Sequence, residues 1–173
     1  MSEKRNKQPD RISLRQTVEA DLDYVIKLER APENAQFIRQ WTIQQHKSAL
    51  TDDNIAHLIV EYANNKAIGY IILIGLQNPD QSIELKRIVI EEKNKGFGKK
   101  TLQLIEKLTF ENLNAHRLWL EVIEHNERAV KLYESEGFVP EGMHRESLKQ
   151  KERFISLKVM SILAQEYDRK GSR

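Results

Sequence analysis

The chain has 173 residues, of which 39% are hydrophobic and 31% charged, with a formal net charge of +2 and no cysteine. This length and composition suit one globular domain with a substantial core. The missing cysteines exclude disulfides, thiolate metal ligands and a cysteine nucleophile, and the small net charge gives no argument for nucleic-acid binding. No apolar run approaches the length of a membrane span, so we expect a cytoplasmic protein with neither a membrane nor a nucleic-acid partner.

The first third of the chain predicts one strand and two helical regions. Residues 1–10 are polar and charged, and we expect them to form a flexible N-terminal tail. Ile12–Val18 alternates apolar and polar residues as a strand does. Glu19–Arg30 has the spacing of an amphipathic helix, which Pro32 interrupts. A second helical region is expected over Glu33–Leu50.

A β-hairpin follows. Two strands, His57–Ala63 and Ala67–Leu76, flank the segment Asn64-Asn65-Lys66. Asparagine tolerates the positive φ angles of tight turns, so this segment predicts the turn between them. Asn78-Pro79-Asp80 predicts the next turn, and Ser82–Ile90 is the fourth predicted strand.

The remaining elements are a helix, a strand, a helix and a final hairpin. Their expected bounds are Gly96–Asn112, His116–Val122, Asn126–Glu136, Phe138–Leu148 and Glu152–Leu163. The strand–helix–strand order from Ser82 onward is a βαβ unit with parallel strands, whereas the hairpins around it are antiparallel. We therefore expect an α/β (α+β) fold: one domain over residues 11–165 with a mixed, mostly antiparallel seven-stranded sheet and helices on both faces. Residues 166–173 are expected to form a C-terminal tail.

The apolar pattern of the fourth strand changes phase in its middle. Ile83 and Leu85 occupy odd positions, but Ile88 and Ile90 occupy even ones. Because side chains alternate across a strand, a change of face needs one extra residue, so we predict a β-bulge near Lys86-Arg87. The alternative is a strand buried on both faces, whose pattern need not alternate.

Residues 93–99, here called the glycine turn, join that strand to a helix and begin Lys93-Asn94-Lys95-Gly96-Phe97-Gly98. A helix N-terminus exposes unpaired amides, and glycines let a phosphate approach the backbone, so the turn suits a pyrophosphate. The dinucleotide pattern G-x-G-x-x-G fails at Thr101, and the P-loop pattern fails at Lys93 and Lys100. The turn resembles the acetyl-CoA pattern Gln/Arg-x-x-Gly-x-Gly/Ala, with Lys93 in the first position. The alternative is a plain helix start with capping glycines and solvated lysines.

The segment His116–Gly142 strongly resembles the second half of the acyl-CoA site of GNAT superfamily N-acetyltransferases. The matching residues are Asn126, Ala129, Leu132-Tyr133 and Gly137-Phe138. Together with the glycine turn, the resemblance covers about Ser82–Gly142, and the order of strands extends it over nearly the whole chain. Within the superfamily, the chain looks most like the group of ribosomal-protein alanine and spermidine acetyltransferases.

The resemblance implies a role for each part of this region, with acetyl-CoA as co-substrate. The backbone of the fourth strand would bind the pantetheine arm like an added strand, and the bulge would splay the fourth and fifth strands. The amides of the glycine turn would bind the pyrophosphate, and Asn126 would contact the arm of the cofactor. The implied cofactor-binding residues are Ile88, Val89, Ile90, Lys93, Lys95, Gly96, Phe97, Gly98, Lys99, Asn126, Ala129 and Tyr133.

Amine acetylation needs a neutral amine, a polarised thioester and a proton for the departing thiolate. The resemblance implies Tyr133 as the acid, and Glu84 is the candidate base because family members often carry an acid there. A backbone N–H near Ile88 would polarise the carbonyl. The alternative for Tyr133 is a tyrosine packed on the sheet, and that for Glu84 is a solvent-facing strand glutamate. The alternative for Asn126 is a helix N-cap. We expect direct transfer in a ternary complex without a metal, since the histidines lack metal-ligand spacing.

The acceptor is not identified by the sequence: a protein N-terminus, a polyamine and a small amine all stay open. Trp41 and His46 lie where GNATs build the acceptor wall, although core packing explains Trp41 better. The resemblance also allows a homodimer. The alternative function is a GNAT-fold sensor or scaffold that binds acyl-CoA without turnover.

Overall fold

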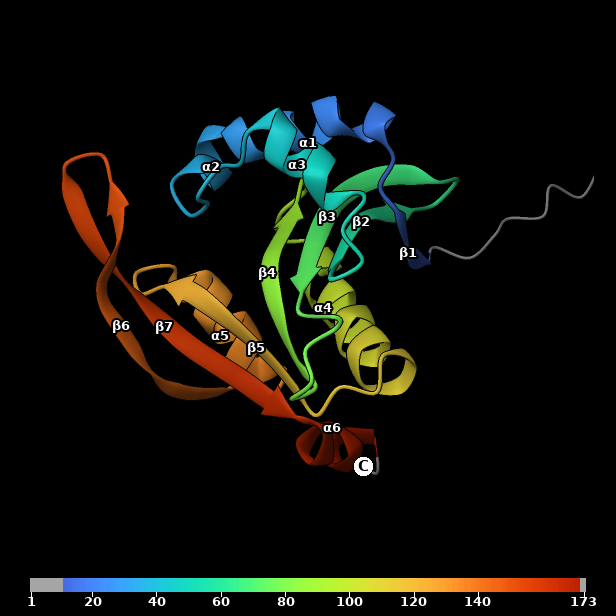
Figure 1. The fold of residues 1–173 in the computed structure, drawn as a ribbon, viewed down its shortest axis with the longest axis vertical. Coiled ribbons are helices and arrows are strands. Elements are labelled where there is room, and N and C mark those ends of the chain that lie inside the picture. Colours follow the sequence, from blue (N-terminus) through green and yellow to red (C-terminus); the bar gives the residue numbers. More distant parts are fainter. Residues whose placement is uncertain (1–10, 172–173) are drawn as a thin grey trace, which may run out of the picture.

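Seven strands form one twisted sheet in the order β1-β2-β3-β4-β5-β7-β6 (Figure 1). The structure is a computed structural model and describes residues 11–171. Every neighbouring pair of strands is antiparallel except β4 and β5, which are parallel, so the expected mixed, mostly antiparallel sheet is confirmed. The strands are β1 (Ile12–Gln16), β2 (Ile55–Tyr62), β3 (Lys66–Ile74), β4 (Ser82–Ile90), β5 (Arg117–Ile123), β6 (Val139–Gln150) and β7 (Arg153–Leu163).

Helices cover both faces of the sheet, as expected. They are α1 (Leu22–Arg30), α2 (Pro32–Ala35), α3 (Ile43–Ala49), α4 (Phe97–Lys107), α5 (Glu127–Ser135) and α6 (Ala164–Gly171), with a 3₁₀ turn before α1 (Glu19–Asp21) and a π turn after α4 (Leu108–Asn112). The larger core joins α4 and α5 to one face, and a smaller core packs α1 against the other. Within residues 11–171, no helix is both long and apolar enough to cross a membrane.

The expected helix over Glu33–Leu50 is wrong, because this segment contains two short helices separated by residues 36–42. The side chain of Thr42 accepts a hydrogen bond from the amide of Gln45 at 3.2 Å, and the Gln45 side chain accepts one from the Thr42 amide at 2.8 Å. This reciprocal capping box begins a new helix at residue 43. Residues 36–42 are therefore a loop, and that loop becomes one wall of the cleft described below.

The two ends of the chain were both expected to be tails. The N-terminal tail over residues 1–10 lies outside the described residues. At the other end the expectation fails for residues 166–171, which lie in α6. Lys170 on this helix donates hydrogen bonds of 2.6 Å to the carboxylate of Glu106 and to the backbone carbonyl of Glu136. These contacts dock α6 against the ends of α4 and α5.

The β2–β3 hairpin is present, with its turn one residue earlier than expected. Tyr62 pairs with Lys66, and Ala63, Asn64 and Asn65 between them all have positive φ angles of 25–60°. Lys66 is the first residue of β3 rather than part of the turn.

The predicted β-bulge in β4 is present at Lys86. Ile72 and Leu73 are adjacent on β3, but their partners on β4 are Arg87 and Leu85, so Lys86 is the extra residue. Before the bulge, Leu85 faces the larger core; after it, Ile88 faces that core and Val89 faces the smaller one. The phase change of the apolar pattern therefore has the cause that the sequence predicted.

Beyond the bulge, β4 and β5 separate. The two strands pair only where Ser82–Glu84 meets Arg117–Trp119. From there they diverge in the shape of a V, and β5 continues along β7 (Figure 1). The edge of β4 that faces β5 is thus exposed within the sheet.

Replacing Gly69 by alanine should destabilise the junction of β3 and β4. A Cβ there would lie 2.3 Å from the carbonyl oxygen of Val89 and 2.8 Å from the Ile90 side chain, so the backbone of one strand would have to move. We expect Gly69→Ala to lower the free energy of unfolding by about 2 kcal/mol in urea denaturation. Gly142→Ala is the matched control, because a Cβ at Gly142 meets no atom within 4 Å. Equal midpoints for the two variants would contradict this packing.

Candidate active site

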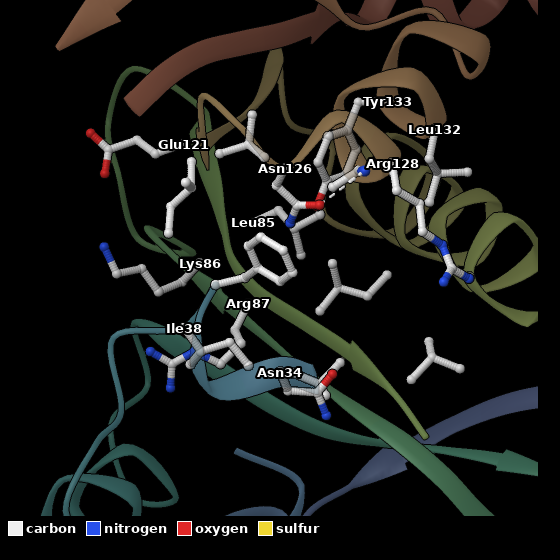
Figure 2. Close-up of a pocket in the computed structure, with 18 of the residues that line it drawn as sticks. Asn34, Ile38, Leu85, Lys86, Arg87, Glu121, Asn126, Arg128, Leu132 and Tyr133 are labelled. Atoms are coloured by element: carbon white, nitrogen blue, oxygen red, sulfur yellow. Dashed lines mark hydrogen bonds between the residues drawn. The ribbon is translucent and has the colours of Figure 1, made fainter. Parts of the chain in front are cut away.

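A cleft of about 840 Å³ occupies the space where β4 and β5 diverge. Its walls come from β4 and β5, the glycine turn, α5 and the loop of residues 36–42. Figure 2 shows Asn126 and Tyr133 on one side of the cleft and Asn34 and Ile38 on the opposite side. The cleft thus brings together segments that are far apart in the sequence, from residue 33 to residue 157.

The glycine turn begins α4 at one end of the cleft. Gly96 is the N-cap, with a φ angle of +74° that favours glycine, and Lys100 makes the first intrahelical bond, to the Gly96 carbonyl at 3.1 Å. The amides of Phe97, Gly98 and Lys99 therefore have no acceptor within the helix. A Cβ at Gly98 would lie 3.6 Å from Leu132, which also lines the cleft. Free amides beside two glycines, which have no side chain, fit a phosphate anion.

The three predicted cofactor-binding lysines of the turn differ in position. Lys93 lines the cleft, but its ammonium group donates to the side chain of Asn34 at 2.8 Å and to the carbonyl of Ile90 at 2.5 Å. Burial lowers the pKa of Lys93, and nearby Arg128 lowers it further. Lys99 lines the cleft and forms an ion pair of 3.1 Å with Glu136. Lys95 pairs with Glu92 and is not part of the cleft lining.

The exposed edge of β4 presents backbone groups to the cleft. Just past the strand, the amide of Glu91 donates to the carbonyl of Ile68 at 2.8 Å. Consecutive amides of a strand point to opposite edges, so the amides of Ile88 and Ile90 face the cleft while that of Val89 faces β3. An extended chain bound in the cleft can pair with Ile88 and Ile90, as a pantetheine arm would.

Asn126, Ala129 and Tyr133 on α5 all line the cleft. Asn126 is also the N-cap of α5, since its side-chain oxygen accepts from the Ala129 amide at 3.3 Å. Tyr133 is largely buried and packs against Phe138, with 5.6 Å between the ring centres. Burial raises the pKa of Tyr133, so its hydroxyl keeps its proton near neutral pH. Arg128, on the same helix, also lines the cleft and was missed; its place between Asn126 and Ala129 was the available signal.

Glu84 lies at the closed end of the cleft, in the last residue pair that joins β4 to β5. Its carboxylate pairs with the ammonium of Lys86, the bulge residue, at 3.0 Å. The lining also contains Glu33, Glu92 and Glu121, and none of the three was predicted as a site residue; Glu121 lies on β5. It pairs with the ring of His144 at 2.7 Å.

The loop of residues 36–42 forms the wall opposite α5, where Ile38 lies across the cleft from Asn126 and Tyr133 (Figure 2). Phe37, Ile38, Arg39, Gln40 and Trp41 all line the cleft. Trp41 lines the cleft and also packs against the smaller core, so the expected core packing is present as well. His46 is fully buried on α3 and absent from the lining.

A splayed mixed sheet, an anion-binding helix start and a strand edge open to an extended chain define an acyl-CoA-dependent acyltransferase. The model of the Acetyltransferase (GNAT) family matches residues 22–138. The chain belongs to this family and is an acetyl-CoA-dependent N-acetyltransferase.

Its relatives are spermidine acetyltransferases. The chain is 33% identical over 117 residues to spermidine N(1)-acetyltransferase of Vibrio cholerae, covering 67% of this chain and 68% of that protein. The crystal structure of the Vibrio cholerae spermidine N-acetyltransferase with CoA and spermine superposes with a TM-score of 0.82 at 27% identity, covering 90% of this chain and 97% of that one. A dodecameric structure of the same enzyme has a TM-score of 0.77 at 27% identity, with 90% and 95% coverage.

A line of buried polar rings lies behind the loop wall. His57 on β2 is 2% exposed; its two ring nitrogens lie 2.9 Å from the Thr17 hydroxyl and 3.1 Å from the His46 ring. Burial lowers the pKa of His57 from 6.5 to about 4. The charged or titratable groups that also act on it are His46 and Arg87, which lower its pKa, and Glu29 and Asp21, which raise it.

We expect His57 to make the protein less stable as the pH falls from about 6.5 to about 4. In that range the unfolded chain binds a proton at this histidine that the folded chain does not bind. The free energy of unfolding therefore decreases as the pH decreases. The size is about 3 kcal/mol, at about 1.4 kcal/mol per pKa unit. Urea denaturation across this range should show a smaller loss for His57→Gln, whereas His144→Gln, at an exposed histidine, should keep the full loss. The same loss in both variants would contradict the assignment.

Proposed function

We propose that the protein acetylates a primary amine of a polyamine by direct transfer from acetyl-CoA in a ternary complex. The observation that carries this proposal is that the glycine turn and the loop of residues 36–42 line one continuous cleft. Both substrates can therefore occupy it together, and Tyr133 and Glu84 line the same cleft. Such an arrangement needs no covalent enzyme intermediate.

Acetyl-CoA, when bound, supplies the activated acetyl group. The chain's own groups do the rest: the amides of Phe97, Gly98 and Lys99 bind phosphate, and those of Ile88 and Ile90 orient the extended arm. An amide on this edge also polarises the acyl carbonyl. The Tyr133 hydroxyl, protonated at neutral pH, donates its proton to the leaving sulfur. Glu84 accepts the amine proton, directly or through one water.

Polyamines are the first candidate acceptor because the similar enzymes are named for spermidine and one was solved with spermine. The carboxylates of Glu84 and Glu121 in the cleft can attract a cation. A second candidate is an amine in a molecule that also carries a carboxylate, such as a small amino acid or a short peptide. The observation that favours it is that the cationic side chains of Arg39 and Lys86 line the same end of the cleft.

We also infer that the chain self-associates, as the dodecameric relative does. Its β6–β7 hairpin exposes three large apolar side chains, Val139, Met143 and Phe154.

An acidic residue in the glycine turn should weaken CoA binding without harming the fold. Gly98 occupies the second position of α4, where an aspartate stabilises the helix but repels a phosphate. We expect Gly98→Asp to raise the Kd for CoA at least tenfold in calorimetry while the thermal midpoint stays the same or rises. Gly142→Asp places the same charge outside the cleft and should change the Kd little. Unchanged affinity in Gly98→Asp would remove the turn as the pyrophosphate site.

Replacing Tyr133 by phenylalanine should reduce kcat about a hundredfold and leave the KM for acetyl-CoA within about twofold. The missing hydroxyl removes the proton donor but keeps the buried ring. Because the chain has no cysteine, a thiol reagent reports released CoA directly. The assay should compare spermidine, spermine, amino acids and short peptides, with Tyr167→Phe on α6 as control.

A wild-type rate in Tyr133→Phe would contradict its role as acid. Tight CoA binding without turnover on any amine would instead favour the sensor or scaffold. Preference for peptides or amino acids over spermidine would select the second acceptor class.

A further inference from the structure

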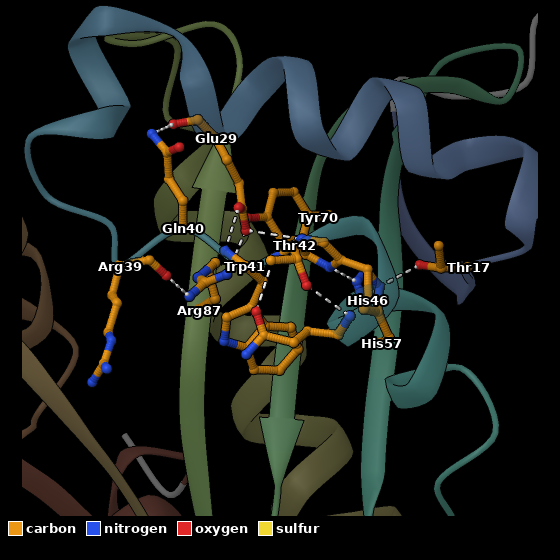
Figure 3. A network of polar contacts seen from close by, with 11 residues as sticks. Thr17, Glu29, Arg39, Gln40, Trp41, Thr42, His46, His57, Tyr70 and Arg87 are labelled. Carbon is orange, nitrogen blue, oxygen red and sulfur yellow. Dashed lines mark hydrogen bonds and ion pairs between the residues drawn. The ribbon is translucent and has the colours of Figure 1, made fainter.

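A buried ion pair, Glu29 and Arg87, lies against the loop of residues 36–42, and Arg87 also lines the cleft. Glu29 on α1 is 1% exposed and Arg87 on β4 is 7% exposed, and their charged groups are in direct contact (Figure 3). The Tyr70 hydroxyl donates to the same carboxylate oxygen at 2.6 Å, and the ring of His46 lies 3.3 Å from it. Arg87 also neutralises the carboxylate, so the pair has no net charge.

This pair holds three consecutive residues of the loop. The second carboxylate oxygen of Glu29 accepts from the backbone amide of Trp41 at 3.1 Å. The guanidinium of Arg87 donates to the backbone carbonyl of Arg39 at 2.6 Å and lies 5.1 Å from the centre of the Trp41 ring. The side chain of Gln40 donates to the backbone carbonyl of Glu29 at 3.4 Å. Figure 3 shows these contacts meeting at Arg39, Gln40 and Trp41.

The loop depends on such partners because residues 36–42 belong to no helix or strand. Its backbone polar groups need acceptors and donors from elsewhere. A buried ion pair is costly to desolvate, and apolar residues of similar volume often stabilise a core as well or better. The pair is therefore better explained by the geometry that it imposes on the loop than by its contribution to stability.

The bulge in β4 is what gives Arg87 this position. In a regular strand, Arg87 would lie on the same face as Leu85, two residues before it, among the apolar side chains of the larger core. With the bulge, Arg87 faces α1 and the loop, while the amide of the next residue, Ile88, faces the cleft. The bulge thus directs the side chain of Arg87 toward the loop and the backbone amide of the adjacent Ile88 toward the cleft.

We propose that Glu29 and Arg87 are positioning residues for the acceptor amine: they fix the loop of residues 36–42 in the shape that binds the amine. This inference rests on the proposed function of the cleft. It assigns the pair to amine binding rather than to acetyl-CoA binding or to folding alone.

The test compares variants that disturb different bonds of the same carboxylate. In Glu29→Gln, an NH₂ group that cannot accept a hydrogen bond replaces one of the two oxygens. If it replaces the first oxygen, the bonds from Tyr70 and Arg87 are lost; if it replaces the second, the bond from the Trp41 amide is lost. In Arg87→Lys, one nitrogen cannot reach both Glu29 and the Arg39 carbonyl. Both variants should raise the KM for the amine at least tenfold, with the KM for acetyl-CoA within twofold. Tyr70→Phe is the matched control, because it removes a bond of 2.6 Å to Glu29 but touches no loop atom.

A second measurement follows the loop without catalysis. The chain has two tryptophans, so Trp119→Phe leaves Trp41 as the single reporter. In that background, Glu29→Gln and Arg87→Lys should make Trp41 fluorescence more accessible to acrylamide, and Tyr70→Phe should not. Should Glu29→Gln not fold, Arg87→Lys and Gln40→Ala carry the test, the latter with a severalfold rise in amine KM.

Several outcomes overturn the proposal. One is that Tyr70→Phe changes the amine KM and the quenching as much as Glu29→Gln does. Another is that both substrates lose affinity together, since this is the result of a purely structural role. If the wild-type protein acetylates no amine, the proposed function fails, and unchanged Trp41 quenching in Glu29→Gln and Arg87→Lys would separately overturn the positioning role.

Discussion

The structure depends on one extra residue in the middle of the sheet. Lys86 interrupts the regular alternation of β4, so the residues that follow it exchange faces. Pairing between β4 and β5 stops at Glu84, because the bulge bends and twists the strand away from its neighbour. The cleft is the direct consequence, and its floor is a strand edge whose amides have no strand beside them in the described structure.

The two halves of the cleft meet at this irregularity. Toward the glycine turn, the chain offers backbone amides and a helix start, which suit phosphates and an extended amide-bearing arm. Toward the loop of residues 36–42, it offers aromatic, cationic and acidic side chains. Tyr133 from α5 and Glu84 from β4 line the same cleft. In the proposed function, backbone groups bind the co-substrate and the side chains of a loop bind the acceptor, as is common where a rigid scaffold carries specificity on loops.

Buried charge is used here to shape the molecule at two places. Glu29 and Arg87 hold the loop wall, and Lys170 holds α6 against Glu106 and the end of α5. Each charge is paired and hydrogen-bonded, which is the condition under which a charge is tolerated in a low-dielectric interior. His57 is buried in its neutral form instead, because burial lowers its pKa to about 4 and it carries no charge at pH 7.

The sequence by itself determined the features that depend on neighbouring residues. The phase change from Leu85 to Ile88 located the bulge, the glycines located the helix start, and the paired asparagines located the hairpin, because side-chain alternation and positive φ angles are local properties. Only the tertiary structure decided that residues 36–42 are a cleft wall, that Lys93 points inward to Asn34 and that α6 docks. The contacts responsible join residues far apart in the chain, by 58 positions for Arg87 and Glu29 and by 64 for Lys170 and Glu106. No local pattern marks such partners, so polar side chains that look solvated in the sequence can be the ones that the fold buries.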